Sequence, residues 1–262
     1  MYVDSHCHLN APELRHQLDG IRAAMAAAQV DRALCICTTL EEFPEVHALA
    51  MAHDNFWATV GVHPDTEGLA EPDLPTLLAL ARRPRVVGLG ETGLDYYRLN
   101  GRSLAEMEWQ RERFRVHIRA ARRTGLPLVI HTRSASEDTL AILRDEGEQQ
   151  VGGVFHCFTE TEAVARAALD LGFMISFSGI LTFRNAEALR QVARFVPLDR
   201  CLIETDSPYL APVPCRGKTN NPSYVPHVAA QLAQIKGVPV EAVARATGAN
   251  FEQLFRVPEA RK

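Results

Sequence analysis

The feature that most constrains the fold is an alternation, repeated along the chain, of short apolar segments with longer segments of helical periodicity. Short runs rich in β-branched residues are typical of buried strands, and apolar residues recurring about every 3.6 positions indicate helices. The predicted strands are Tyr2–His6, Ala33–Thr38, Trp57–Val62, Val86–Gly90, Leu128–His131, Val154–His156, Phe173–Phe177 and Cys201–Glu204. The predicted helices are Ile21–Gln29, Leu74–Arg83, Leu104–Thr124, Glu137–Gly147, Glu160–Leu171, Ala186–Phe195, Pro222–Lys236 and Val240–Phe255.

Strands that alternate with helices favour an α/β fold with a parallel sheet. Eight such units in 262 residues predict a (β/α)8 TIM-like barrel that forms one domain over residues 1–262, because these barrels run to about 250 residues. An open, doubly wound sheet is the main alternative. That fold usually carries a Gly-rich phosphate loop after its first strand, whereas this chain has His6-Cys7-His8 there.

Composition excludes several classes of protein. The chain has 28 basic and 32 acidic residues and a net charge of −4, which argues against coating nucleic acid by bulk charge but leaves room for a local grip on phosphates. No apolar run approaches the roughly 18 residues of a membrane helix, and the start of the chain does not resemble a signal peptide. Six scattered cysteines without a C-x-x-C pair indicate a reduced, cytoplasmic protein. No helix has an obvious exposed apolar stripe, so a monomer is favoured.

Most of the informative residues stand where a predicted strand ends. In a parallel barrel all strand carboxyl ends open on one face, where active sites form. Five strands bring possible metal ligands to that face: His6, His8, Glu91, His131, His156 and Asp206. Imidazole and carboxylate groups suit Mg, Mn, Zn or Co. Each residue alone could be an ordinary polar strand end, but a buried set of this kind needs partners.

The spacing of the ligands favours two ions. His6 and His8 are two positions apart, so in a strand both side chains point the same way. Glu91 lies on the fourth strand, between the His pairs, and is predicted to bridge two divalent ions about 3.5–4 Å apart. Asp206 is predicted to bind metal and to accept or orient the proton of an attacking water. The alternative for Asp206 is a helix N-cap before Ser207-Pro208.

Six motifs in order resemble the TatD family of metal-dependent deoxyribonucleases in the amidohydrolase superfamily. They are Val3-Asp4-Ser5-His6-Cys7-His8-Leu9, Gly61-Val62-His63-Pro64, Gly90-Glu91-Thr92-Gly93-Leu94-Asp95-Tyr96, His131-Thr132-Arg133, His156-Cys157-Phe158-Thr159 and Glu204-Thr205-Asp206-Ser207-Pro208-Tyr209. The resemblance implies a metallo-dependent hydrolase barrel in which His6, His8, Glu91 and Asp206 hold one ion. It implies that Glu91, His131 and His156 hold the other, and that His63 lies near the bound phosphate.

Other residues near the predicted site are candidates for substrate binding. Arg133 follows His131 by two positions and is predicted either to hold a phosphate or to pair with a ligand carboxylate. Five aromatic residues in loops after the predicted strands are candidates to stack a terminal base, with loop packing as the alternative for each: Tyr96, Tyr97, Phe158, Phe183 and Tyr209. Arg216 and Lys218 flank Gly217 after the last strand and are predicted to grip phosphate, unless they belong to a solvated loop.

Two enzymatic functions fit this site. The first, which the resemblance implies, is phosphodiester hydrolysis that trims single-stranded DNA or 3′ ends in the 3′–5′ direction. The second is hydrolysis of an amide or ester, for example removal of D-amino acids from tRNA, because the same metal chemistry serves carbonyl centres. A non-catalytic barrel is disfavoured, since none of the predicted ligands is missing from the sequence.

Overall fold

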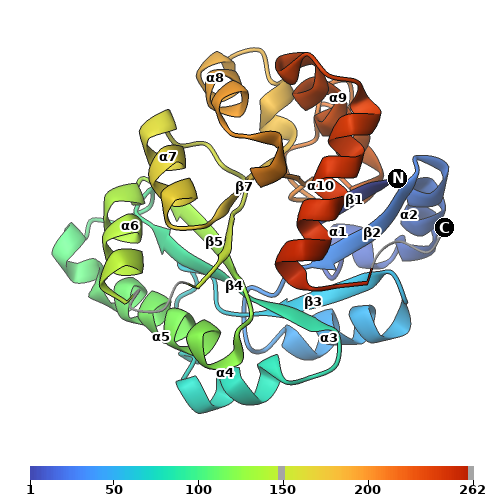
Figure 1. Cartoon of the computed structure of the whole chain (residues 1–262). Coiled ribbons are helices and arrows are strands. Elements are labelled where there is room, and N and C mark those ends of the chain that lie inside the picture. The colour runs from blue at the N-terminus through green and yellow to red at the C-terminus, as the bar shows by residue number, and fades with distance from the viewer. Residues whose placement is uncertain (147–150, 259–262) are drawn as a thin grey trace.

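The computed structural model describes residues 1–146 and 151–258, and eight parallel strands form its centre (Figure 1). Each strand pairs in parallel with the next in chain order, so the sheet runs from β1 to β8 in sequence order. The strands are β1 Tyr2–Cys7, β2 Val30–Cys35, β3 Phe56–Val60, β4 Val86–Asp95, β5 Leu128–Arg133, β6 Gly153–Phe155, β7 Met174–Phe177 and β8 Cys201–Ile203. The predicted barrel is confirmed.

Helices surround the strands on the outside of this sheet, as the ring in Figure 1 shows. They are α1 Pro12–Arg15, α2 Leu18–Ala27, α3 Phe43–Ala52, α4 Leu74–Ala81, α5 Glu108–Thr124, α6 Ser136–Asp145, α7 Glu162–Asp170, α8 Glu187–Phe195, α9 Val225–Lys236 and α10 Val240–Phe255. Short 3-10 turns, η1 Leu104–Met107, η2 Gly179–Thr182, η3 Leu198–Arg200 and η4 Pro222–Tyr224, join several of them. The predicted helix Glu137–Gly147 is present up to Asp145, and its last residue lies outside the described ranges.

The first and last strands meet just beyond the end of β8. Cys7 and Ser207 form a parallel bridge, and the His8 amide donates a hydrogen bond to the Ser207 carbonyl at 2.8 Å. The Asp206 amide donates to the His6 carbonyl at 3.0 Å. This contact closes the barrel. It also places the predicted metal ligands His6 and His8 next to Asp206.

Apolar side chains fill the barrel where the strands begin. Val3, Leu34, Val129 and Leu202 lie in one buried cluster with residues of α10. Phe251 and Phe255 of that helix are 0% and 2% exposed, and burying such a ring stabilises a fold by about 1.5–3 kcal/mol. The C-terminal helix therefore closes this end, and the opposite end of the barrel remains for chemistry.

Two differences from the sequence prediction have physical causes. β4 extends five residues past the predicted end at Gly90, because Gly93 and Asp95 continue the ladder opposite His131 and Arg133. Polar residues inside a strand looked like its end. The helices α1 and α3 were not predicted. α1 has only four residues, too few to show a helical period, and in α3 every position from Ala48 to Ala52 is apolar, which hides the period.

None of the helices in the described ranges combines the length and the apolar character needed to span a membrane.

His117 ties α5 to the segment after β3. Its side chain is fully buried. Nε2 accepts a hydrogen bond from the Val62 amide at 3.1 Å, and Nδ1 donates to the Arg113 carbonyl at 2.8 Å. Burial lowers the pKa of His117 to about 4. In the unfolded chain the pKa of His117 is near 6.5, so the imidazole takes up a second proton more readily there than in the folded chain.

We expect this difference to appear as pH-dependent stability. Above pH 6.5 the contribution of neutral His117 is fully present, and it is lost as the pH falls from 6.5 toward 4, by up to about 3 kcal/mol. Denaturant unfolding of metal-free wild type and His117→Gln between pH 7.5 and 4.5 measures it. The stability advantage of wild type should shrink on acidification, and an advantage that is constant with pH would contradict the assignment.

Candidate metal centre

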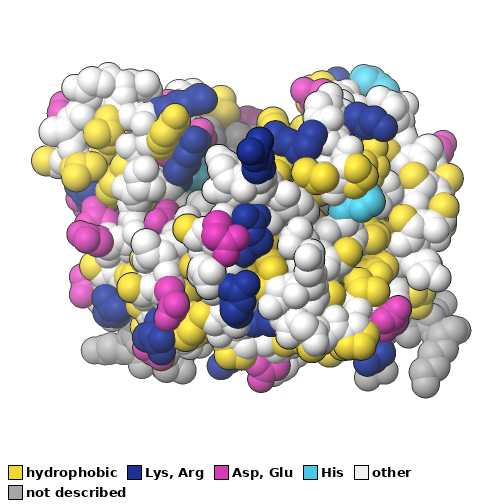
Figure 2. All heavy atoms as spheres, turned by 90° about the horizontal axis from the view of Figure 1, so that it is seen from above, with side chains coloured by type: hydrophobic (Ala, Val, Ile, Leu, Met, Phe, Trp, Pro, Cys, Tyr) yellow, Lys and Arg dark blue, Asp and Glu magenta, His cyan; other side chains and the backbone are white. Residues whose placement is uncertain are grey.

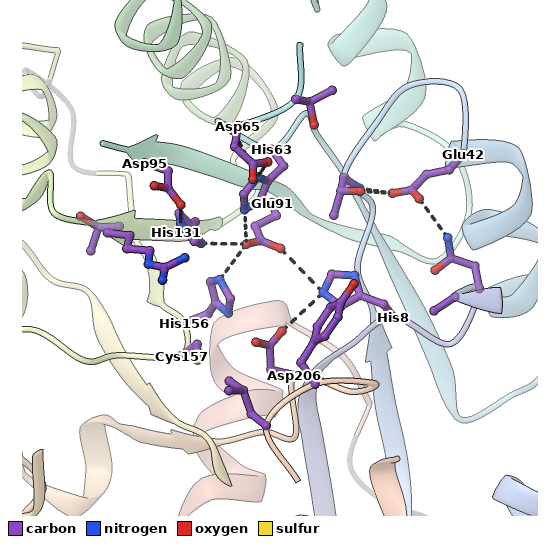
Figure 3. Close-up of a pocket in the computed structure, with 18 of the residues that line it drawn as sticks. His8, Glu42, His63, Asp65, Glu91, Asp95, His131, His156, Cys157 and Asp206 are labelled. Atoms are coloured by element: carbon purple, nitrogen blue, oxygen red, sulfur yellow. Dashed lines mark hydrogen bonds and ion pairs between the residues drawn. The ribbon is translucent and has the colours of Figure 1, made fainter. Parts of the chain in front are cut away.

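The predicted ligands converge at the carboxyl ends of the strands, around a cavity of about 940 Å³. His8, Glu91, His131, His156 and Asp206 line this cavity. His6 lies directly beneath it and is completely buried. Figure 3 shows Glu91 at the centre, between His63 and His131 on one side and His8 on the other. All six predicted ligands are therefore brought together.

The two carboxylate oxygens of Glu91 face two different groups of imidazoles. Oε2 lies 3.3 Å from His6 Nε2 and 3.9 Å from His8 Nε2. Oε1 lies 2.8 Å from His156 Nε2 and 3.2 Å from both His131 Nδ1 and His63 Nε2. We call the group with His6 and His8 the first cluster, and the group with His131 and His156 the second cluster. The Glu91 carboxylate belongs to both, which is the arrangement that a bridging ligand requires.

The first cluster has the spacing of a cation site. His6 Nε2 and His8 Nε2 are 3.3 Å apart, and Asp206 Oδ1 lies 3.6 Å and 3.4 Å from them. Ligands about 2.0–2.2 Å from one tetrahedral ion stand roughly 3.3–3.6 Å from each other. With Glu91 Oε2, the cluster offers two imidazole nitrogens and two carboxylate oxygens, a donor set that suits the divalent ions predicted from the sequence.

Glycine allows the backbone to bring Glu91 to this position. At Gly90 φ is +149°, and a Cβ there would lie 2.6 Å from the Val129 carbonyl oxygen on β5. Any other residue would therefore force β4 and β5 apart. The Glu91 amide also donates to the Cys37 carbonyl at 2.7 Å. These contacts fix the carboxylate through the main chain on both sides of β4.

Carboxylates that the sequence analysis did not assign orient the imidazoles from behind. Asp95 Oδ2 lies 3.0 Å from His131 Nε2, and Glu204 Oε1 lies 3.2 Å from His156 Nδ1. Asp65 accepts a short hydrogen bond from His63 Nδ1. Such partners fix the ring orientation of metal-binding histidines. Asp95 lies four positions after Glu91 on the same face of β4, so a longer predicted strand would have revealed it.

The local charges keep both acidic ligands ionised. Burial alone would raise the pKa of Glu91, but His156, His63 and His6 hold it well below its ordinary value. Burial also opposes ionisation of Asp206, and the hydrogen bond from His8 lowers its pKa. The same attraction raises the pKa of His63 to about 10 against the effect of burial. At His8, His63 and His156, whose pKa values are raised, a divalent ion would take the place of a bound proton.

The predicted substrate contacts fall into two groups. His63 and Arg133 line the cavity with the ligands. Tyr96 and Phe158 are 6% and 2% exposed and do not line it, and the Tyr96 hydroxyl donates to Asp138 at 2.7 Å. Neither ring has a free face for a base, so for these two the packing alternative holds. Arg216 and Lys218 are exposed on the loop after β8, beyond the cavity lining.

Comparison with known proteins agrees with this geometry. Residues 3–256 match the model of the TatD related DNase family. The chain belongs to this family. The "Uncharacterized metal-dependent hydrolase YcfH" of Escherichia coli is 48% identical over 99% of this chain and 97% of its own length. The "3'-5' ssDNA/RNA exonuclease TatD" of Cronobacter turicensis is 36% identical over 95% of both chains. The crystal structure of the Escherichia coli TatD homologue YJJV superposes with a TM-score of 0.90, at 29% identity over 98% of each chain.

Removing the shared carboxylate should weaken both clusters at once. We expect Glu91→Ala to lose most bound Mn²⁺ after chelator treatment and reloading. His8→Ala should affect only the first cluster, and His131→Ala only the second. Equilibrium dialysis with elemental analysis gives the metal content, and Glu187→Ala, an exposed carboxylate on α8 that pairs with Arg190 and does not line the cavity, is the control. A Glu91→Ala variant with wild-type metal content would contradict the bridging assignment.

Proposed function

We propose that this TatD-family protein is a divalent-metal-dependent hydrolase of nucleic-acid phosphodiester bonds, most specifically a 3′–5′ exodeoxyribonuclease. Two ions, of Mg, Mn, Zn or Co, would be held by His6, His8, Glu91 and Asp206 and by Glu91, His131 and His156. The substrate would be single-stranded DNA or a 3′ end, bound by one domain spanning residues 1–262. The name of the Cronobacter relative supports this substrate class.

The observation that carries the proposal is the position of Arg133. It follows His131 by two residues on β5 and lines the same cavity. Its guanidinium lies 3.6 Å from the centre of the Tyr97 ring, and within the described residues it makes no ion pair. A guanidinium held beside a metal cluster without its own carboxylate suits a phosphate oxygen better than a neutral carbonyl.

Asp95 fixes the position of Arg133 relative to His131, a proposed metal ligand. Its Oδ1 accepts a hydrogen bond from the Tyr97 amide at 2.9 Å, while Oδ2 faces His131. Asp95 also stands opposite Arg133 in the pairing of β4 with β5. The cationic group and the second cluster are thus fixed to the same short piece of sheet, and a phosphate between them would be held by both.

The residues then divide the work of hydrolysis. Bound divalent ions supply Lewis acidity that makes water a nucleophile near neutral pH and stabilises negative charge on the phosphoryl oxygens. Asp206, ionised and at the cavity surface, accepts the proton of the attacking water. Arg133 and His63 hold the phosphate so that the new P–O bond forms as the bond to the leaving oxygen breaks. Glu91 would bind to both clusters and so hold them at a fixed separation.

A metal-rescue assay tests this function. The chelator-treated protein is given Mg²⁺, Mn²⁺, Co²⁺ or Zn²⁺ with single-stranded DNA labelled at either end, and a D-aminoacyl ester is tested in parallel. We expect mononucleotides to be released from the 3′ end only after metal is added. Protein that binds the metal and cleaves only the ester would overturn the nuclease assignment in favour of carbonyl chemistry.

Arg133→Ala should weaken DNA turnover by about 10–100-fold in kcat/KM, because the variant loses a forked contact to phosphate. The salt dependence of DNA binding should become shallower by about one unit of slope. Arg133→Lys should restore only part of the activity, since an ammonium lacks the fork. Arg123→Ala, on the exposed face of α5, controls for net charge. Equal losses in the two alanine variants would contradict a specific phosphate contact.

A further inference from the structure

One edge of the cavity is apolar and lies beside the first cluster. Ile180, Tyr209 and Leu210 line it, and we refer to these three residues as the apolar shelf. Tyr209 is 62% exposed, although most large apolar side chains of this protein are buried. Its ring centre lies 6.5 Å from that of His8. The shelf therefore presents an open aromatic ring next to a candidate metal ligand.

Buried contacts hold the shelf in place. The side-chain amide of Asn220 is inaccessible to solvent and donates to the carbonyls of Tyr209 at 2.6 Å and Thr205 at 2.8 Å. The Tyr209 amide donates to the Asp206 carbonyl at 3.0 Å. The backbone that carries the Tyr209 ring is thus fixed relative to Asp206, a proposed metal ligand.

The backbone of the shelf is strained. Leu210 has φ of +58°, a left-handed conformation that costs a residue with a β-carbon about 1–2 kcal/mol. Its carbonyl approaches Gly179 so closely that a Cβ there would lie 2.0 Å away. Strain of this kind persists where the surrounding structure enforces it, commonly at ligand sites. Here the strained residue directly follows Tyr209, and both residues line the cavity.

The opposite edge of the cavity has the contrary character. Arg98, Thr132 and Arg133 line it, next to the second cluster. An apolar shelf on one side of the two clusters and guanidinium groups on the other match the two ends of a nucleotide, a flat base and an anionic phosphate. The cavity volume of about 940 Å³ is at the upper end of ligand pockets, so there is room for more than the scissile phosphate.

We infer that Tyr209 is a specificity-determining residue that stacks on the base of the 3′-terminal nucleotide. This assignment rests on the proposed nuclease function and adds a substrate requirement to it. The base lies on the apolar shelf, and the scissile phosphate lies at the clusters, where Arg133 contacts it from the opposite side of the cavity. Stacking depends on a base of any identity, so the site distinguishes nucleotides from abasic ends and not one sequence from another.

The test compares two substrates with two enzymes. Metal-loaded wild type and Tyr209→Ala are given single strands that end in a normal 3′ nucleotide or in an abasic one. For the normal end we expect Tyr209→Ala to lower kcat/KM by roughly 5–100-fold, the range of one stacking contact. For the abasic end the two enzymes should differ by less than about twofold. Tyr209→Phe should behave as wild type.

A binding measurement separates stacking from a structural effect. A strand with a 3′-terminal 2-aminopurine and a non-hydrolysable last linkage is titrated with the metal-loaded protein, so that cleavage does not interfere. Quenching of its fluorescence should be strong with wild type and Tyr209→Phe, and lost with Tyr209→Ala. Val213→Ala is the matched control, because Val213 is exposed on the same loop and does not line the cavity.

The outcomes distinguish this inference from the function on which it rests. Equal loss of activity on both ends in Tyr209→Ala, or unchanged quenching, would overturn the stacking role and leave the nuclease intact. A wild-type enzyme that cleaves neither strand with any metal would instead overturn the proposed function, and the base subsite with it. A loss confined to the normal end, together with lost quenching, supports both.

Discussion

The site depends on one buried carboxylate surrounded by imidazoles. Glu91 is 3% exposed, and a carboxylate so far from water is unfavourable unless charges or hydrogen bonds compensate it. His6, His63, His131 and His156 each place a nitrogen within 3.3 Å of one of its oxygens. The compensation comes from four different strands or strand ends, so it exists only when the barrel has formed. The fold and the metal centre are therefore one energetic unit.

Barrel closure supplies the second half of this arrangement. Asp4, on β1, accepts hydrogen bonds from the Thr205 amide at 2.9 Å and from the Thr205 hydroxyl at 2.5 Å. Thr205 stands between Glu204, which orients His156, and Asp206, which faces His6 and His8. The contact between Asp4 and Thr205 across the seam thus positions Glu204 and Asp206, the neighbours of Thr205. Burial raises the pKa of Asp4 to about 8. The seam of a barrel is usually a structural detail, but here it is part of the site.

The sequence predicts the barrel and the convergence of the candidate ligands, because both follow from short-range patterns. An alternating strand and helix pattern indicates parallel strands, and polar residues at strand ends must then meet at one face. The partners behind the ligands escape this reasoning, because Asp95 and Glu204 look like any acidic residue until their distances to His131 and His156 are known. Tyr96 failed for the related reason that position in a loop does not fix which way a ring points. The exposed fraction of each ring distinguishes the two: the Tyr96 ring is buried, whereas the Tyr209 ring is exposed beside the cavity.

The distribution of charge is compatible with the proposed anionic substrate, although the protein is slightly acidic overall. From Ser207 to Val240 the sequence contains no acidic residue, and it carries Arg216 and Lys218 on the loop after β8. Figure 2 shows Lys and Arg side chains gathered toward the upper edge of one side of the molecule. Long-range attraction from a net charge of −4 is unfavourable for DNA. In the proposed nuclease, recognition would then come from local contacts: metal ions at the clusters, the Arg133 guanidinium and the Tyr209 ring. These contacts lie around one cavity, which suits the proposed binding of a chain end.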